Sequence, residues 1–171
     1  PETKGEKKSE LEVAPQKLQP ADFFDSAAQE EIFFASGKAG LQLFTKERTT
    51  TISSDSFSQY KEKLADLLKE QTPLYGHNLK EVFRLASQLG LELPKEVGFD
   101  TKLAAYLLQP SQSEYSLSEL KGRFFQDVFK TKEKLEEKLE EKELKELYFQ
   151  IELPLIKILF QMEANGILVD E

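Results

Sequence analysis

The stretch "LYGHNLKEVFRLASQLGLEL", residues 74–93, joins a short extended segment to a helix. Residues 73–76 predict one short strand that leads into it. Asn78 is a good N-cap, and Glu81 stands at the third helical position, from which a carboxylate reaches back to the cap. Gly90 ends the helix. The apolar residues between these ends recur at helical spacing: Leu79, Val82, Phe83, Ala86 and Leu89. The stretch therefore predicts an amphipathic helix with one buried face.

The residues before this helix have the pattern of short strands. Segments rich in β-branched, aromatic or alternating apolar residues predict strands at 31–35, 40–45 and 49–52. Because the two connections are short, these strands are expected to form an antiparallel meander. Ser56 and Gln59 then match a capping box, which predicts a helix that continues to about Gln71 and that Pro73 ends.

The residues after it have the pattern of a block of helices. Asp100 can cap a helix over 101–108, and Ser116 can cap the next one. A run of Lys and Glu predicts a helix over 132–146. A last helix is predicted over 151–165, and its apolar residues share a face: Ile151, Leu155, Leu159 and Met162. The chain is therefore expected to have strands first and helices after.

Composition limits the classes of function open to the chain. Its 171 residues suffice for one domain with a real core, or for one domain plus a fragment. The net charge of −8 and the pI near 4.9 disfavour binding of a phosphate backbone by the bulk surface. Cysteine is absent, which excludes thiol chemistry and is compatible with a reducing cytoplasm. No apolar run approaches the roughly 18–20 residues of a membrane span.

Four phrases resemble the 3′–5′ exonuclease domain of bacterial DNA polymerase I, and they occur in that family's order: "YGHNLKEVFRLASQLGLEL" (75–93), "FDTKLAAYLLQP" (99–110), "YSLSEL" (115–120) and "IELPLIKILFQMEANGILVD" (151–170). The first resembles the second exonuclease motif and the helix after it. The last resembles the segment where that domain passes into the polymerase domain, and it is the most specific of the four. The resemblance implies an α/β fold, a ribonuclease H-like mixed β-sheet of about four to five strands flanked by helices.

The resemblance also implies three parts of the chain. Residues 1–18 are charged and contain proline, and they are expected to be a linker or disordered tail. Residues 19–150 correspond to the exonuclease-like domain. Residues 151–171 correspond to the first helix of the polymerase domain.

In this family two divalent metal ions are held by four carboxylates from three motifs. Two Mg²⁺ ions about 3.5–4 Å apart need several anionic oxygens, and they activate water and stabilise the leaving 3′ oxygen. The first motif is an aspartate, any residue and a glutamate at the end of the first strand, where this chain has Ala35 and Gly37. The second supplies an aspartate where this chain has Val82, which can bury apolar area worth roughly 1.5–2 kcal/mol but offers no ligand. Asp127 best matches the third motif's aspartate, but Arg123 replaces its tyrosine.

The other acidic candidates have simpler roles. Glu30 and Glu31 are expected to be solvated charges before a strand, and Glu81 is expected to serve the helix cap. Tyr148-x-x-x-Glu152 imitates the spacing of the third motif, but it lies too late in the chain. We therefore predict no metal site and no cofactor for this domain, with Mg²⁺ needed only by the parent polymerase domain.

Histidine and basic residues add no second site. His77 is the only histidine, no acid or nucleophile is paired with it in the sequence, and it is expected to be a polar residue before a helix cap. Glutamates are interleaved with the densest basic patch, so it predicts a solvated helix face rather than a phosphate site: Lys121, Arg123, Lys130, Lys132 and Lys134.

The resemblance implies a fragment of a bacterial DNA polymerase I, whose intact parent extends primers in replication and repair. The missing carboxylates predict that this domain is a catalytically inactive, vestigial 3′–5′ exonuclease. It would support the polymerase domain and space it from an upstream 5′-nuclease domain. We expect a cytoplasmic monomer that binds DNA weakly or not at all by itself. Two alternatives stay open: an active two-metal exonuclease with misaligned carboxylates, and an unrelated module that docks through the charged helix at 132–146.

Overall fold

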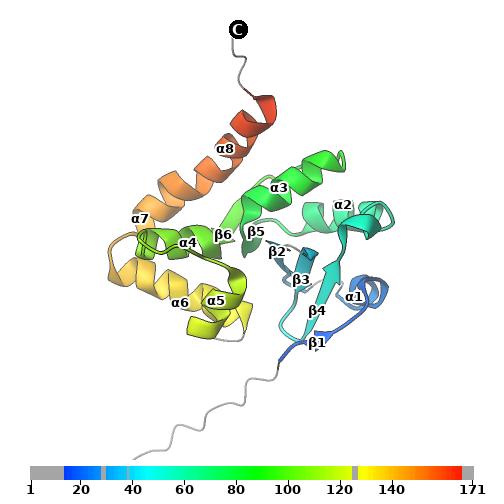
Figure 1. Ribbon diagram of the computed structural model, residues 1–171, viewed down its shortest axis with the longest axis horizontal. Helices are drawn as coiled ribbons and strands as arrows, with labels where there is room; N and C mark the ends of the chain where they lie inside the picture. The colour runs from blue at the N-terminus through cyan, green and yellow to red at the C-terminus, as the bar shows by residue number, and fades with distance from the viewer. Residues whose placement is uncertain (1–13, 28–29, 38, 125–126, 167–171) are drawn as a thin grey trace, which may run out of the picture.

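Figure 1 shows the computed structural model of the chain, which describes residues 14–27, 30–37, 39–124 and 127–166. Its strands are β1 (Gln16–Lys17), β2 (Phe33–Gly37), β3 (Gly40–Phe44), β4 (Arg48–Ile52), β5 (Leu74–His77) and β6 (Val97–Asp100). Its α-helices are α1 (Pro20–Ser26), α2 (Lys61–Glu70), α3 (Leu79–Gln88), α4 (Thr101–Leu108), α5 (Leu117–Arg123), α6 (Val128–Glu141), α7 (Lys145–Leu147) and α8 (Leu153–Asn165). A 3₁₀ turn, η1 (Ser54–Ser56), precedes α2, and a π-helical turn, η2 (Tyr148–Glu152), precedes α8.

The strands form one mixed sheet in the order β1-β4-β3-β2-β5-β6. β2, β3 and β4 make the predicted antiparallel meander, whereas β5 runs parallel to both β2 and β6. The predicted α/β class with a mixed sheet is therefore confirmed. The sheet has six strands rather than the expected four to five. β1 and β6 were not predicted, because they are only two and four residues long and carry no periodic pattern.

β1 lies within the segment that we expected to be a linker. Gln16 and Lys17 pair with β4, and the amide of Leu18 donates to the carbonyl of Thr49 at 2.8 Å. The expectation of a linker over residues 1–18 is therefore wrong for its last residues. Residues 1–13 lie outside the described part of the chain.

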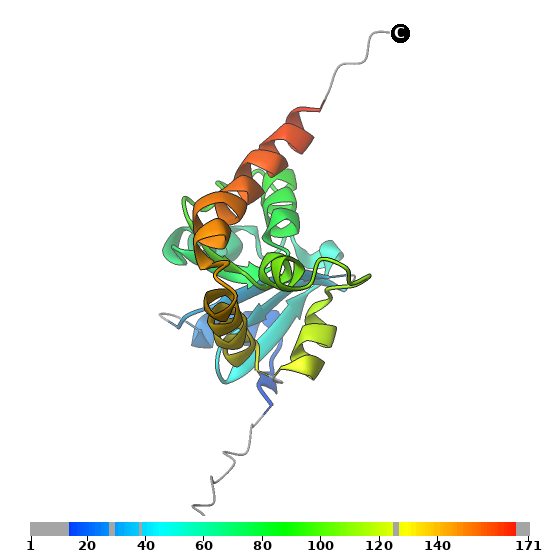
Figure 2. The ribbon, with the colours of Figure 1, turned by 90° about the vertical axis from the view of Figure 1, so that its left-hand side faces the viewer.

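The two faces of the sheet carry two separate apolar clusters. Alternate residues of a strand point to opposite faces. Phe34 of β2 packs with α2 and α3, whereas Phe33 and Ala35 pack with Val128 and Phe129 at the start of α6. In Figure 1, α3 lies above the strands, whereas α6 lies to their left. Figure 2 shows the same elements from the side.

Two predicted helix boundaries differ from the structure. α2 begins at Lys61 without a side-chain cap, because the hydroxyl of Ser56 lies 3.0 Å from that of Ser53 and does not cap a helix. The charged helix expected over 132–146 starts earlier and ends earlier, as α6, because Glu143 adopts a positive φ of 58°. Lys145 therefore pairs with Glu140, at 3.0 Å, after the chain has turned.

The last helix presents the opposite face to the one that its pattern suggested. Leu153, Ile156 and Phe160 are buried, whereas Ile151 and Met162 are 53% and 61% exposed. The helix ends at the predicted place, before Gly166. Residues 167–171 of the expected 151–171 segment lie outside the described part. Among the described residues, no helix combines the length and the apolar character needed to cross a bilayer.

Candidate functional site

Ala35 and Gly37, the two positions of the first motif, lie at the carboxyl end of β2. Ala35 is buried and pairs with Gln42 of β3 on one side and with His77 of β5 on the other. It packs against the start of α6, and Gly37 is exposed at the strand's end. Neither residue has a side chain that can bind a metal ion.

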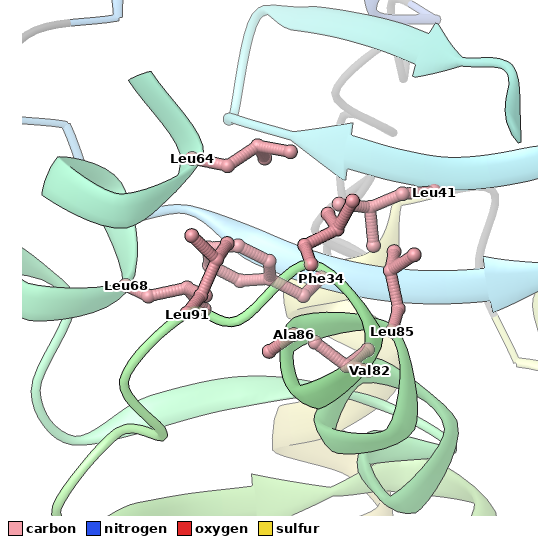
Figure 3. Close-up of a pocket in the computed structure, with 9 residues that line it drawn as sticks. Phe34, Leu41, Leu64, Leu68, Val82, Leu85, Ala86 and Leu91 are labelled. Carbon is pink, nitrogen blue, oxygen red and sulfur yellow. The ribbon is translucent and has the colours of Figure 1, made fainter. Parts of the chain in front are cut away.

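Val82, the position of the second motif, lies on the other face of the sheet. It is 2% exposed and lines a small cavity between α3, α2 and the meander. Figure 3 shows the side chains that converge around Val82: Phe34, Leu41, Leu64, Leu68, Leu85, Ala86 and Leu91. Leu89 completes the lining, and every one of these side chains is a hydrocarbon. The position that would hold an acidic ligand is therefore part of an apolar core.

The structure places these two motif positions, Ala35 and Val82, on opposite faces of the sheet. A shift of one residue along a strand moves a side chain to the other face. The residues of β2 on the face of Val82 are Phe34 and Ser36, not Ala35 and Gly37. Because Phe34 and Ser36 are not carboxylates either, both registers leave the first motif without a ligand.

Asp127 serves a local structural role. Its carboxylate accepts hydrogen bonds from the amides of Phe129 (2.7 Å) and Lys130 (3.3 Å), so it caps the start of α6. The aspartate is therefore engaged by its own helix, and a carboxylate at a helix N-terminus is stabilised there without a metal.

The remaining acidic candidates are also spread over the fold. Glu30 binds Arg48 at 2.6 Å, and Glu81 binds Arg84 within α3. Glu81 therefore does not reach back to the cap as predicted. Glu31 is exposed before β2, which confirms the interpretation as a solvated charge.

Asp100 is a buried carboxylate with two structural roles, and only one of them was predicted from the sequence. It caps α4, as predicted, by accepting from the amides of Lys102 (2.8 Å) and Leu103 (3.3 Å). It also accepts from the amides of Asn78 (3.1 Å) and Leu79 (2.7 Å), so it caps α3 as well. The prediction that Asn78 caps α3 with its side chain is wrong. This double cap joins residues 21 and 22 positions apart, which no local spacing indicates.

Tyr148 packs beside this double cap. It is fully buried, and its hydroxyl accepts from the amide of Asp100 (2.7 Å) and donates to its carbonyl (3.0 Å). Burial, followed by the negative charge of Asp100, raises the pKa of Tyr148 well above its ordinary value. Tyr148 therefore fixes η2 to the end of β6. Glu152, the acidic residue of the Tyr148-x-x-x-Glu152 spacing, is half-buried in the same turn.

His77 is a buried, neutral histidine. Its Nδ1 lies 2.9 Å from the hydroxyl of Thr101. Burial lowers the pKa of His77 to about 4, and the nearby Asp100 opposes this effect only in part. His77 therefore carries no charge at pH 7, in agreement with its predicted role as a polar residue before a helix.

A cleft of about 690 Å³ opens at the carboxyl ends of β2 and β5. Most of the residues that line it are small or polar: Ala35, Ser36, Gly37, Gln42, His77, Asn78, Lys102, Ser113, Glu114, Tyr115, Ser116, Leu117 and Ser118. Glu114 is the one acidic residue in this lining, so the cleft offers no pair of carboxylates. Across residues 14–27, 30–37, 39–124 and 127–166, no three Asp, Glu or His side chains gather closely enough to hold a metal ion.

The side chains of the predicted basic patch make contacts within the domain. Four of its side chains meet a ring or a carboxylate: Lys121 over Phe44 (5.5 Å), Arg123 with Glu119 (3.4 Å), Lys132 over Tyr75 (4.8 Å) and Lys134 with Glu137. These side chains come from both α5 and α6, and that of Lys132 is 19% exposed, so they do not form the single solvated helix face that was predicted.

Comparisons with known proteins agree with this architecture. The family model described as DNA polymerase I, ribonuclease H-like domain, matches residues 27–148. Among solved structures, the POL domain of Pol1 from M. smegmatis, in complex with DNA primer-template and dNTP, shares the fold with a TM-score of 0.67 and 24% sequence identity. The match covers 88% of this chain and 31% of that chain, so this chain spans about a third of that protein's length. No curated protein matches the chain.

The family match settles one of the two alternatives. A module unrelated to polymerases is excluded, because the matched residues include the whole meander, both parallel strands β5 and β6, and the helices α2 to α7. With well over half of its residues matched, the chain belongs to the family of ribonuclease H-like domains of DNA polymerase I.

Proposed function

We propose that this domain is a catalytically inactive relative of the 3′–5′ exonuclease domain and acts as a structural scaffold within a DNA polymerase I. The observation that carries the proposal is the environment of Val82. The second motif position lies in a buried hydrocarbon cluster, where an ionised carboxylate would lose its hydration without gaining a partner. A two-metal mechanism cannot start there.

The other motif positions support the same proposal. Ala35 lies on the opposite face of the sheet from Val82, and Asp127 is engaged in a helix cap. Two-metal hydrolysis requires anionic ligands that converge from several elements on one pocket. Here the motif positions diverge, and the cleft beside β2 has one acidic residue, Glu114, in its lining.

The scaffold role concerns the parent protein. We propose that the parent is a bacterial DNA polymerase I that copies DNA in replication and repair, which implies the bacterial cytoplasm. In it, this domain would support the polymerase domain and hold it apart from an upstream 5′-nuclease domain. DNA would be bound through the parent, because the charge of −8 opposes binding of a phosphate backbone by this domain.

An exonuclease assay tests the proposal and its rival, an active enzyme with misaligned carboxylates. The purified domain is incubated with 3′-labelled single-stranded DNA and Mg²⁺ or Mn²⁺, and released label is followed over time. We expect no release above a buffer control. Release that depends on the metal and that disappears with a chelator would contradict the proposal and support the active enzyme.

A binding assay tests the statement about DNA. We expect the isolated domain to bind primer–template DNA very weakly at moderate salt. Submicromolar binding, measured by fluorescence anisotropy, would require a basic groove and would contradict this part of the proposal.

A further inference from the structure

A small pocket lies between α4, α5 and α6, and it shares no lining residue with the cleft beside β2. Figure 1 shows these three helices next to one another. The pocket has a volume of about 50 Å³, and three cationic side chains line it: Arg123, Lys138 and Lys142. Among the described residues in its lining, none is acidic. In a chain with a net charge of −8, such a concentration of positive charge calls for an explanation.

Lys138 differs from the lysine one turn before it on α6. Lys134 pairs with Glu137, three positions on, as helical spacing allows. Lys138 has Glu141 at the same spacing, but its ammonium group lies over the ring of Phe124 instead, 5.7 Å from the ring centre. Within the described part of the chain, Lys138 forms no ion pair. Its charge is therefore directed to the pocket and is not compensated along the helix.

The hydrogen-bond acceptors beside the pocket are already engaged. The carbonyl oxygen of Leu108, at the end of α4, accepts from Nζ of Lys142 at 3.4 Å. The side-chain oxygen of Gln109 accepts from Nη1 of Arg123 at 3.3 Å and also from the side-chain amide of Gln112. A ligand in the pocket would therefore meet N–H donors: two ammonium groups, a guanidinium group and the amide nitrogen of Gln109. Donors without free acceptors are the lining that an anion needs.

Arg123, unlike the two lysines, has a carboxylate partner among the described residues. Its Nη2 lies 3.4 Å from Oε1 of Glu119, and the two side chains are 40% and 37% exposed. An ion pair this long and this exposed contributes little. The guanidinium group carries five N–H donors, so Arg123 can hold a second anion while it keeps this contact.

The size and charge of the pocket select the ligand. A volume of about 50 Å³ holds about three water molecules, which is room for one oxyanion group and not for a larger molecule. A carboxylate has a single negative charge, whereas a phosphate group carries more and so matches three cations better. Lysine binds phosphate as a point charge, and arginine binds it through paired N–H groups.

We propose that this pocket binds the phosphate group of a small molecule, either a free phosphate ion or a phosphate monoester. The proposal goes beyond the scaffold function and does not rest on it. Because the three cations come from α5 and from the second half of α6, a bound phosphate would also hold these two helices together.

The test titrates the 171-residue chain with inorganic phosphate, pyrophosphate and methyl phosphate at constant ionic strength, and backbone amide signals report the place of binding. We expect saturable shifts at the ends of α4, α5 and α6, with pyrophosphate binding most tightly because it carries the most charge. Methyl phosphate distinguishes the sources. If it binds as tightly as phosphate, the site accepts a monoester, and if it binds more weakly, the site takes the free ion. Acetate, with a single charge, should cause no shift there.

Lys138→Gln removes one charge and keeps a good helix former. We expect the affinity for pyrophosphate to fall by about tenfold or more, because a charge-assisted hydrogen bond is lost. Lys142→Gln repeats this test at an exposed position. Lys69→Gln is the matched control, because Lys69 is an exposed lysine on α2 without an ion pair in the described part, and its affinity should equal that of wild type. Thermal unfolding without ligand checks that each variant folds, and pyrophosphate should raise the midpoint of the wild type.

Three results would overturn the proposal. One is the absence of saturable binding by any of the phosphates. Another is an equal loss of affinity in Lys138→Gln and Lys69→Gln, which would indicate a general attraction of anions to positive charge. The third is acetate binding as tight as that of phosphate. None of these results depends on exonuclease activity, so this proposal and the scaffold function can fail separately.

Discussion

At the scale of single residues, Asp100 connects more of the structure than any motif position. Its carboxylate accepts from the backbone amides of Asn78, Leu79, Lys102 and Leu103, which belong to the starts of α3 and α4. The free amides at a helix start need acceptors, and a charged acceptor is the stronger kind. One buried side chain thus sets the positions of two helices.

Asp100→Ala should therefore cost about twice as much stability as the loss of an ordinary cap. A single cap contributes about 1 kcal/mol, so we expect a loss of about 2–4 kcal/mol for two caps and a buried site. Asp127→Ala is the control, since Asp127 caps α6 alone and should cost about 1 kcal/mol. Urea unfolding measures both. Equal losses in the two variants would contradict the double cap.

His77 should make stability depend on pH. The folded pKa is about 4, below the ordinary value of 6.5, so the unfolded chain binds more protons between these values. The contribution of His77 to the free energy of unfolding should be fully present above pH 6.5 and should be lost as the pH drops towards 4. We expect the free energy of unfolding to fall by about 2–3 kcal/mol between pH 7.5 and 4.5. His77→Gln removes this titration. The stability difference between wild type and the variant, from urea unfolding, should change over this window, and a constant difference would contradict the burial of a neutral ring.

Val82→Asp restores the residue type of the second motif, and we expect it to damage the fold without restoring metal binding. The new carboxylate would face Phe34 and Leu41 without a partner, which should cost about 3 kcal/mol or more. Val82→Ala, the control for lost volume, should cost about 2 kcal/mol. Denaturant unfolding with and without Mn²⁺ measures both effects. A Val82→Asp domain that is stable and that Mn²⁺ stabilises further would contradict the account.

At the scale of elements, the pair α3 and α8 combines an apolar contact with an ion-pair network. Phe83 and Phe160 form the apolar contact, and Glu163 joins the two helices through Lys80 and Arg84. Exposed ion pairs contribute little and are weakened by salt, whereas a buried aromatic ring contributes much more.

Phe160→Ala should therefore destabilise the domain far more than Glu163→Gln. We expect about 3–4 kcal/mol for Phe160→Ala, and a small, salt-sensitive effect for Glu163→Gln. The measurement is urea unfolding of both variants at low and high NaCl. If Glu163→Gln were the more damaging of the two, the ion pairs rather than the aromatic contact would hold α8, and this account would be wrong. An effect of Glu163→Gln that did not shrink in salt would also contradict it.

Most elements could be predicted from sequence, and the exceptions have physical reasons. β2, β3, β4, β5, α3 and α4 follow from periodicity and from caps or stops close to their ends. β1 and β6 were missed because they are short and depend on pairing with distant strands. The capping box at Ser56 failed because another serine engages its hydroxyl. The early end of α6 depends on the left-handed conformation of Glu143, a residue type without a strong preference for it.

The sequence shows which residue types occupy the motif positions, but it does not show where these positions lie in the fold. The sequence shows that Val82 cannot bind a metal, and the structure places it in an apolar cluster as expected. The face on which Ala35 lies depends on the register of β2, which a one-residue shift reverses. The second cap provided by Asp100 requires that β6 end beside the start of α3, which is a property of the folded sheet.

At the scale of the whole molecule, the chain has a ribonuclease H-like mixed sheet flanked by helices, and Val82 lies in an apolar cluster on one face of that sheet. The carboxylates that remain stabilise helix starts and ion pairs, at Asp100, Asp127 and Glu81. The apolar surface of α8 faces outward, where a neighbouring domain can cover it. These features support the proposed scaffold function.

The most direct test of the central claim is a titration of the domain with Mn²⁺, followed by calorimetry and by the line broadening of backbone amide signals. An intact exonuclease site would hold two ions between the ends of β2 and α3. We predict no saturable heat of binding in the micromolar range and no selective broadening near Ala35 or Val82. Two saturable sites, with broadening centred on these residues, would contradict the account.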